Sequence, residues 1–174
     1  MFVLVELEKE LEIPPRFFGP RLREEVERRL RAEVEGTCSG LHGFVLAVVE
    51  VLSIGHGVVR EGSGSAVFKA RCRAVAAAPE RGEVLDAVVT GVSRMGFFAE
   101  AGPLQVFVSS HLIPEDFEHS ATGEPSWETP DGQQRIVAGA EVRLRVVGTR
   151  VDAAEIFAVG DVKGDYLGVI SAPL

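Results

Sequence analysis

The residues suited to acid–base, nucleophilic or metal chemistry are scattered along this sequence rather than grouped. The acidic pair Glu115–Asp116 has no apolar run around it. Acid–base catalysis usually needs a carboxyl group with a pKa that is raised by burial among apolar residues. No C-x-x-C spacing indicates a zinc site, and no serine lies in a G-x-S-x-G turn. The histidines lack H-x-x-x-H spacing; they are His42, His56, His111 and His119. The sequence therefore predicts no enzyme, no metal and no cofactor.

A glycine-rich stretch, residues 55–65, is the next candidate, because glycine loops can hold phosphate groups. It reads GHGVVREGSGS. Its glycines fit neither G-x-G-x-x-G nor G-x-x-x-x-G-K-[ST], since an arginine stands where the third glycine of the first pattern belongs. We interpret the stretch as an exposed loop or hairpin tip, where small residues allow another backbone to approach closely. The residues concerned are Gly55, Gly57, Arg60, Gly62 and Gly64.

Arginines near the end of the sequence are candidates for phosphate contacts. Arg143 and Arg145 alternate with apolar residues, which predicts a strand with both arginines outward, and Arg150 follows. The plainer interpretation is that these are solvated strand positions. The 174 residues carry a net charge of −8; residues 1–80 hold 11 basic and 12 acidic residues, and residues 81–174 hold 7 and 14. Because nucleic-acid affinity comes mainly from neutralising phosphates, we expect modest binding along a local basic stripe.

The first half of the sequence, residues 1–80, has the pattern of an α+β domain. Residues 2–12 predict a strand, and Pro20 to about Glu35 predicts a helix with apolar residues every four positions. Further strands are expected from Phe44 to Ile54 and, by clean alternation, from Ala66 to Ala74.

The second half, residues 81–174, begins after Pro79 and Gly82 and is all-β in pattern. Its exception is residues 115–139, which contain turn residues throughout and six acids before their one base. We predict that this segment is an acidic insertion in a barrel, partly ordered by Phe117 and Trp127. No apolar run reaches the roughly 18 residues of a membrane span, so no membrane association is expected.

The stretch from Gly82 to Pro114 resembles the S1-type OB-fold, a small barrel that usually holds single-stranded RNA. A strand after a glycine, the Gly-Phe-Phe at residues 96–98 and the tight Gly102–Pro103 turn carry this resemblance. RNA-binding S1 barrels typically present one aromatic before the glycine of G-x-F, a second at that Phe, and a histidine in the next strand.

Those three positions are Met95, Phe98 and Ser109 here, so only Phe98 matches. Stacking a base on an aromatic ring is worth ~1–3 kcal/mol, and the loss of two such positions implies weak RNA binding. The resemblance makes Phe98 the candidate for stacking, with barrel packing as the alternative. Arg143, Arg145 and Arg150 are the candidates for replacing part of the lost affinity through phosphate contacts.

Motifs spread along the chain narrow the resemblance. They are FFGP at residues 17–20, VEGTCSG at 34–40, GSGSA at 62–66, GFFAEAGPL at 96–104, FVSSHLIP at 107–114, VRLRVVGTR at 142–150 and YLGVI at 166–170. In this order they resemble the larger stalk subunits of RNA polymerases, in particular the seventh-subunit family of eukaryotic RNA polymerase II with its archaeal relatives. The resemblance extends over essentially the whole chain.

The resemblance implies an α+β fold in which a truncated ribonucleoprotein-like tip domain precedes an all-β S1-type OB-fold barrel. It implies a noncatalytic nuclear subunit that forms a heterodimer with the smaller stalk subunit, docks on the polymerase II core near the clamp and contacts nascent single-stranded RNA weakly. In this interpretation the glycine-rich loop inserts into a groove of the core. The alternatives are the stalk paralogue of RNA polymerase III, a free-standing S1-type RNA-binding protein, and a fragment of an RNA-processing enzyme.

Overall fold

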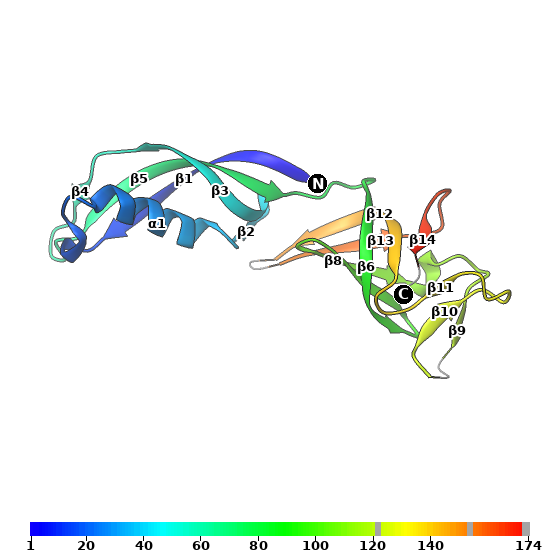
Figure 1. Ribbon diagram of the computed structural model, residues 1–174. Helices are drawn as coiled ribbons and strands as arrows, with labels where there is room; N and C mark the ends of the chain where they lie inside the picture. Colours follow the sequence, from blue (N-terminus) through cyan, green and yellow to red (C-terminus); the bar gives the residue numbers. More distant parts are fainter. Residues whose placement is uncertain (121–122, 153–154, 172–174) are drawn as a thin grey trace. The chain divides into compact units, whose positions relative to one another are not determined.

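The computed structural model describes residues 1–120, 123–152 and 155–171. They divide into two units, Phe2–Ala78 and the chain from Pro79 onward together with Met1 (Figure 1). Residues 121–122 of the predicted insertion, residues 153–154 and the last three residues of the predicted second domain lie outside the described residues.

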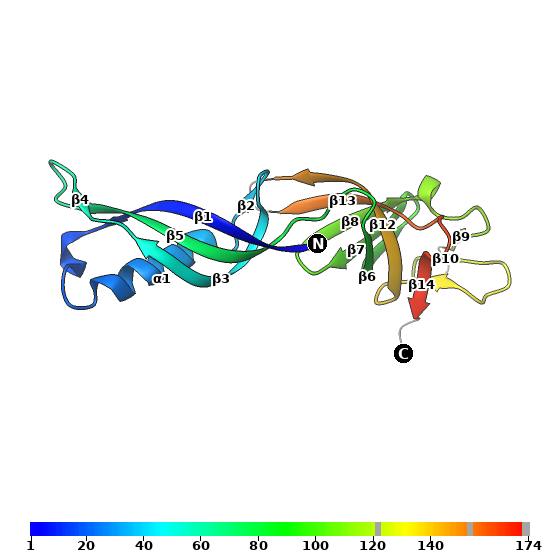
Figure 2. The same cartoon turned by 90° about the horizontal axis from the view of Figure 1, so that it is seen from above.

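The N-terminal unit is an antiparallel sheet with one α-helix. Its elements are β1 (Phe2–Ile13), the 3-10 turn η1 (Pro15–Phe17), α1 (Leu22–Val34), β2 (Cys38–Ser39), β3 (Gly43–Ile54), β4 (Val58–Val59) and β5 (Ala66–Ala77). The strand order is β1-β5-β3-β2, and β4 pairs with β5. The helix α1 runs along one face of this sheet, as Figures 1 and 2 show.

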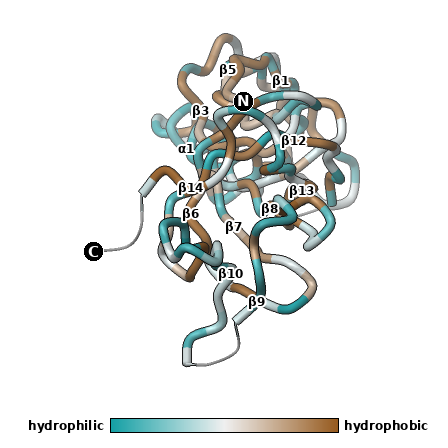
Figure 3. Tube along the Cα trace, turned by 90° about the vertical axis from the view of Figure 1, so that its right-hand side faces the viewer, coloured by the Kyte–Doolittle hydropathy of each residue, from teal (hydrophilic) through white to brown (hydrophobic). Residues whose placement is uncertain are grey.

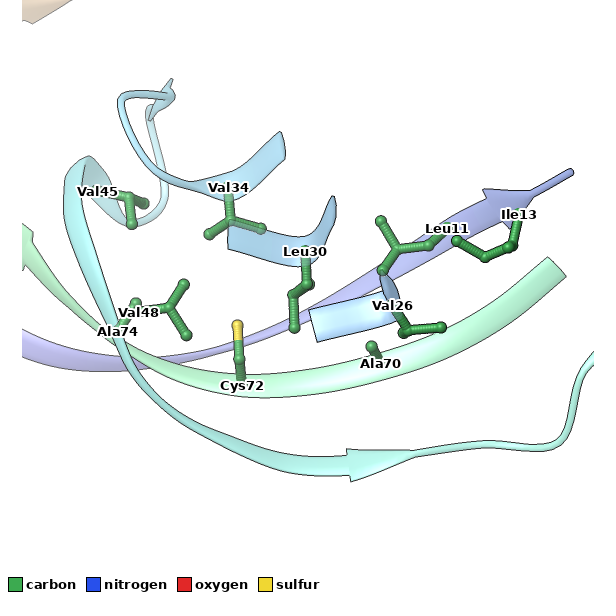
Figure 4. Close-up of a cluster of buried hydrophobic side chains, with 10 residues drawn as sticks. All are labelled: Leu11, Ile13, Val26, Leu30, Val34, Val45, Val48, Ala70, Cys72 and Ala74. Carbon is green, nitrogen blue, oxygen red and sulfur yellow. The ribbon is translucent and has the colours of Figure 1, made fainter. Parts of the chain in front are cut away.

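The core of this unit lies between α1 and the sheet. Every fourth residue of the helix, Val26, Leu30 and Val34, is buried. Small side chains on β5, among them Ala70 and Cys72, meet them from the sheet and let the helix approach closely (Figure 4). The core therefore consists of the apolar residues predicted at every fourth position of the helix and every second position of β5.

The opposite face of the sheet is charged. Residues of β5 that alternate with the buried ones pair with glutamates on β1 and β3: Lys69 with Glu10, and Arg71 and Arg73 with Glu6, at 3.3 Å in each case, and Arg73 with Glu50 at 3.4 Å. Such exposed pairs contribute little to stability each, but they keep this face hydrated.

Strand β3 departs from simple alternation. Its pairing with β5 shifts register between Val45 and Ala47, between Val48 and Glu50, and between Val51 and Ser53. Each shift is a β-bulge that leaves one residue of β3 without a partner on β5. The three unopposed residues are all exposed and apolar: Leu46, Val49 and Leu52. We call them the β3 ridge.

The C-terminal unit is a barrel. Its strands are β6 (Val84–Ser93), β7 (Gly96–Ala101), β8 (Leu104–Ser109), β12 (Glu141–Val151), β13 (Ile156–Asp161) and β14 (Gly168–Ser171). The order is β13-β8-β7-β6-β12-β14, and the additional β12–β13 pairing closes five strands on themselves. The β8–β13 pair is parallel, whereas the others are antiparallel. Closure gives each of these five strands a paired neighbour on both sides.

The segment between β8 and β12 is more ordered than its turn-rich sequence predicts. After the 3-10 turn η2 (Ser110–Leu112) it forms a small sheet of β9 (Glu118–Ser120), β10 (Ser126–Glu128) and β11 (Arg135–Ile136). The indole Nε1 of Trp127 donates a hydrogen bond to the Ser93 carbonyl at 3.1 Å. This bond anchors the small sheet, which extends beyond the barrel strands in Figure 3. None of the helices in the described ranges is long and apolar enough for a membrane span.

Candidate nucleic-acid interface

An apolar groove of about 410 Å³ runs over strands β7, β8, β13 and the end of β12. Its lining combines exposed aromatic rings with one arginine. The residues are Phe98, Gln105, Val106, Phe107, Gly148, Thr149, Arg150, Phe157, Ala158 and Val159. We call it the aromatic groove. A surface with aromatic rings beside a cation is the combination that stacks bases and holds phosphates of single-stranded nucleic acid.

The register of the barrel places the rings side by side. Phe98 pairs with Phe107 across β7 and β8, and Phe107 pairs with Val159 on β13. In the next row, Gln105 pairs with Phe157, which pairs with Arg150 on β12. Side chains of paired residues point to the same face of a sheet, so the two rows form one continuous outer surface.

Phe98 presents its ring to solvent, because half of the residue (51%) is exposed. Behind it, Phe107 is only partly exposed, and the two ring centroids are 4.8 Å apart with planes tilted by 44°. Phe157, 39% exposed, adds a third ring. The structure therefore supplies two aromatic rings, Phe107 and Phe157, that the S1 positions Met95 and Ser109 do not.

A bulge brings Arg150 to this surface. The β12–β13 register shifts between Val146 and Gly148, and this shift reverses which residues of β12 face outward. Without the bulge, Arg150 would face the barrel interior, as Val142 and Val146 do. Arg150 is exposed, lines the groove and forms no ion pair within the described ranges of the chain.

The structure does not bring Arg143 and Arg145 into the aromatic groove. Both lie on the first part of β12, opposite Asp86 and Val84 of β6. Arg143 donates to both carboxylate oxygens of Asp86, at 2.6 and 2.9 Å. These hydrogen bonds hold the pKa of Asp86 below its ordinary value and raise the pKa of Arg143. Of the predicted RNA-binding residues, the structure thus unites Phe98 and Arg150 only.

The glycine-rich loop is built around β4. Val58 and Val59 pair with β5, and Arg60 forms an ion pair with Glu12 at 3.1 Å. A side chain at Gly57 would collide with the ring of Phe68. Gly55 lies close to the Lys69 carbonyl, and Gly62 and Gly64 have positive φ angles of 91° and 68°. Positive φ angles or close contacts within the fold therefore favour glycine at these positions, independently of any docking role.

Phe107 is not among the residues predicted from the sequence, although the sequence contains a signal for it. The two-residue Gly102–Pro103 turn joins β7 to β8, and a two-residue turn fixes the pairing of the flanking strands. Counting outward from it pairs Phe98 with Phe107. Phe157 and the bulge at Gly148 had no comparable signal. No group of three metal-ligating side chains occurs among the residues that the structure describes.

Comparison with known protein families agrees with both units. Residues 8–64 match the family described as "SHS2 domain found in N terminus of Rpb7p/Rpc25p/MJ0397", and residues 78–158 match the S1 RNA binding domain family. The chain thus combines an N-terminal SHS2-type domain with an S1-type domain. The predicted fold class is confirmed.

The whole chain also resembles individual polymerase subunits. It is 50% identical to DNA-directed RNA polymerase II subunit RPB7 of Glycine max and to DNA-directed RNA polymerase II subunit 7 of Arabidopsis thaliana, each over 99% of this chain and 98% of the relative. The Saccharomyces cerevisiae subunit RPB7 is 35% identical over 98% of this chain and its full length. The chain belongs to the family of the seventh subunit of RNA polymerase II. Its predicted membership and its noncatalytic character are thereby confirmed.

Proposed function

We propose that this protein is the larger stalk subunit of a nuclear RNA polymerase II and that it contacts the emerging transcript through its barrel. The observation that carries the proposal is the 50% identity to polymerase II seventh subunits across both units. A free-standing S1 protein would need to match only the barrel. The identity to DNA-directed RNA polymerase IV subunit 7 of Arabidopsis thaliana is lower, 28%, which favours polymerase II.

The heterodimer with the smaller stalk subunit is part of this proposal. Exposed apolar side chains on the N-terminal unit support it, because a partner that covers them would remove apolar surface from water. Phe2 and Leu4 are exposed at the start of β1, and Leu41 is exposed between β2 and β3. The β3 ridge adds three more apolar residues. We assign these surfaces to contacts within the polymerase.

The first domain, residues 1–80, is proposed to dock on the polymerase core near the clamp. Within it we assign the docking contact to the loop of Gly55, Gly57, Arg60, Gly62 and Gly64. The two valines of β4 support this assignment, because Val58 and Val59 are 69% and 62% exposed at the loop. Two adjacent exposed apolar side chains add to the apolar surface that a partner could bury.

The second domain, residues 81–174, is proposed to hold nascent single-stranded RNA in the aromatic groove. Three rings and one arginine with no ion pair in the described ranges support this role. The excess of acids in this half opposes RNA at long range. We therefore expect affinity in the micromolar range, about −8 kcal/mol or weaker.

Affinity purification of the tagged protein from nuclear extract tests the proposal. We expect the smaller stalk subunit and the core subunits of polymerase II to co-purify, and transcript to be crosslinked to the barrel. Recovery with ribosomal or RNA-decay factors, without polymerase subunits, would contradict the proposal.

A further inference from the structure

A second pocket, of about 200 Å³, adjoins the aromatic groove on the other side of Phe98. It is lined by Thr90, Gly91, Phe98, Ala99, Glu100 and Gln105. Phe98 and Gln105 line both cavities. We call the second cavity the polar pocket, because a carboxylate, an amide and a hydroxyl group reach it.

Backbone features of β6 open the polar pocket. The β6–β7 register shifts between Val89 and Gly91, so that Gly91 stands opposite Phe98. Gly91 has no side chain, and a Cβ there would meet nothing within 4 Å. One flank of the Phe98 ring is therefore free for a ligand. A base stacked on Phe98 would extend its edge over this space.

Glu100 is the unexpected residue in this setting. It is exposed and forms no ion pair within the part of the chain that the structure describes. A carboxylate repels the phosphates of RNA. Contacts to the RNA backbone therefore do not explain why Glu100 lies beside a ring that can stack a base. A carboxylate accepts hydrogen bonds only. It can therefore recognise the N–H groups on the edge of a base.

Guanine is the base that fits this chemistry. Its Watson–Crick edge presents two adjacent donors, N1–H and N2–H, which match the two oxygens of a carboxylate, and single-stranded bases are read on that edge. Adenine and cytosine offer one amino group, and uracil offers one ring N–H. Gln105, which pairs with Glu100 across β7 and β8, carries the amide donor that the guanine O6 requires.

The spacing suits one nucleotide. Glu100 lies two residues beyond Phe98 on the same face of β7, which is roughly 7 Å along a strand. Gln105 is diagonal to Phe98 across the strand pair, at roughly 7–8 Å, within reach of long side chains. We propose that the polar pocket reads the edge of a guanine stacked on Phe98, with Glu100 and Gln105 as the specificity-determining residues. This inference rests on the RNA-binding role proposed above.

Fluorescence anisotropy with labelled oligouridylates that carry one central guanine, inosine, adenine or cytosine tests it on the full chain. Inosine is the sharpest probe because it lacks only the N2 amino group. We expect guanine to bind about three- to tenfold more tightly than inosine, as the net contribution of one solvent-exposed hydrogen bond predicts. Glu100→Gln should remove this preference. Glu124→Gln, the same charge change at a residue outside both cavities, should retain it.

Gly91→Val provides a second variant, because it fills the polar pocket while Glu100 stays in place. It should also remove the guanine preference and leave affinity for plain oligouridylate within about twofold, since the aromatic groove remains open. Equal affinity of the unaltered protein for guanine and inosine, or a preference that survives Glu100→Gln, would overturn the inference alone. Absence of binding to every oligonucleotide would overturn the proposed RNA-binding role as well.

Discussion

Phe98 and Phe107 face each other across strands β7 and β8, with ring centroids 4.8 Å apart and planes tilted by 44°. The less exposed Phe107 supports Phe98 from one side, and this contact restricts the exposed ring before any ligand arrives. A ring that is already held loses little conformational entropy when a base stacks on it. Contact with Phe107 therefore prepares the exposed ring of Phe98 for stacking a base.

Replacing Phe98 with alanine should weaken RNA binding by one stacking interaction. The expected loss is ~1–3 kcal/mol, or roughly 5- to 150-fold in the dissociation constant. Met95→Ala should have little effect, because Met95 is exposed but does not line the aromatic groove. Anisotropy titrations with oligouridylate measure both, and thermal unfolding checks that the barrel remains folded. Equal affinities for the two variants would show that RNA does not stack on Phe98.

The arginines of β12 should differ in their effect on the salt dependence of RNA binding. Each phosphate contact to a single strand contributes about 0.7 to the slope of log affinity against log salt concentration. Arg150→Ala should lower the slope by about that amount. Arg143→Ala should leave it nearly unchanged, because Asp86 already engages this side chain. A larger change for Arg143→Ala would place the RNA on the first part of β12.

Gly96→Ala should destabilise the barrel. Gly96 has a φ of 141°, which L side chains rarely adopt, and a Cβ there would overlap the Val108 carbonyl oxygen. The free energy of unfolding should fall by about 2 kcal/mol or more. The fluorescence of Trp127, which is anchored to the barrel, reports urea unfolding. Gly91→Ala, with ordinary φ and open space, is the control and should be close to neutral.

Protonation of Glu25 should weaken the helix of the N-terminal unit. Hydrogen bonds from Arg28 and Arg29 lower the pKa of Glu25 from 4.5 to about 2. A lowered folded-state pKa gives stability that is complete above pH 4.5 and is lost as the pH falls towards 2. Glu25→Gln should therefore reduce the melting temperature at pH 6, and the difference from the unaltered protein should shrink below pH 4.5 and disappear as the pH falls through about 2. Glu24→Gln, measured in parallel by circular dichroism, should show a smaller difference.

Changing Val58 and Val59 together to threonine should weaken docking to the polymerase core. Threonine keeps the β-branched shape that suits β4 but replaces apolar surface that a partner would bury. Binding to the smaller stalk subunit should persist, which gel filtration can verify. Val84→Thr, at another exposed valine, is the matched control. Core affinity that is unchanged in a pull-down titration would remove the loop from the docking surface.

Periodicity in the sequence predicts the elements that carry one regular pattern. The helix expected from Pro20 to Glu35 is α1, Leu22–Val34, and the strand expected from residue 2 to 12 is β1. Strand β3 shows the limit of such patterns. Its core residues Val45, Val48 and Val51 recur every third position, because three bulges interrupt the alternation. Apolar residues at every third position of a strand cannot be distinguished in the sequence from the apolar spacing of a helix.

The candidate site was predictable only where a short turn fixes the register. The Gly102–Pro103 turn determines which residues of β7 and β8 pair, whereas the pairing of Arg143 with Asp86 joins strands far apart in sequence. Alternation shows that an arginine points outward but not which acid lies beside it. The position of Arg150 depended on a bulge, which shifts every later residue of the strand to the other face.

The parallel pairing of β8 with β13 affects the order in which the parts of this protein can fold during synthesis on the ribosome. The last strand of the N-terminal sheet, β5, ends at Ala77, so all strands of that sheet emerge before the barrel begins. Strand β8, in contrast, gains its second neighbour only after β13, Ile156–Asp161, has been synthesised. During that interval its edge and the ring of Phe107 remain uncovered on the nascent chain, where they are open to wrong strand pairing. The surface proposed to hold a transcript is therefore completed late in synthesis and needs protection from wrong pairing during translation.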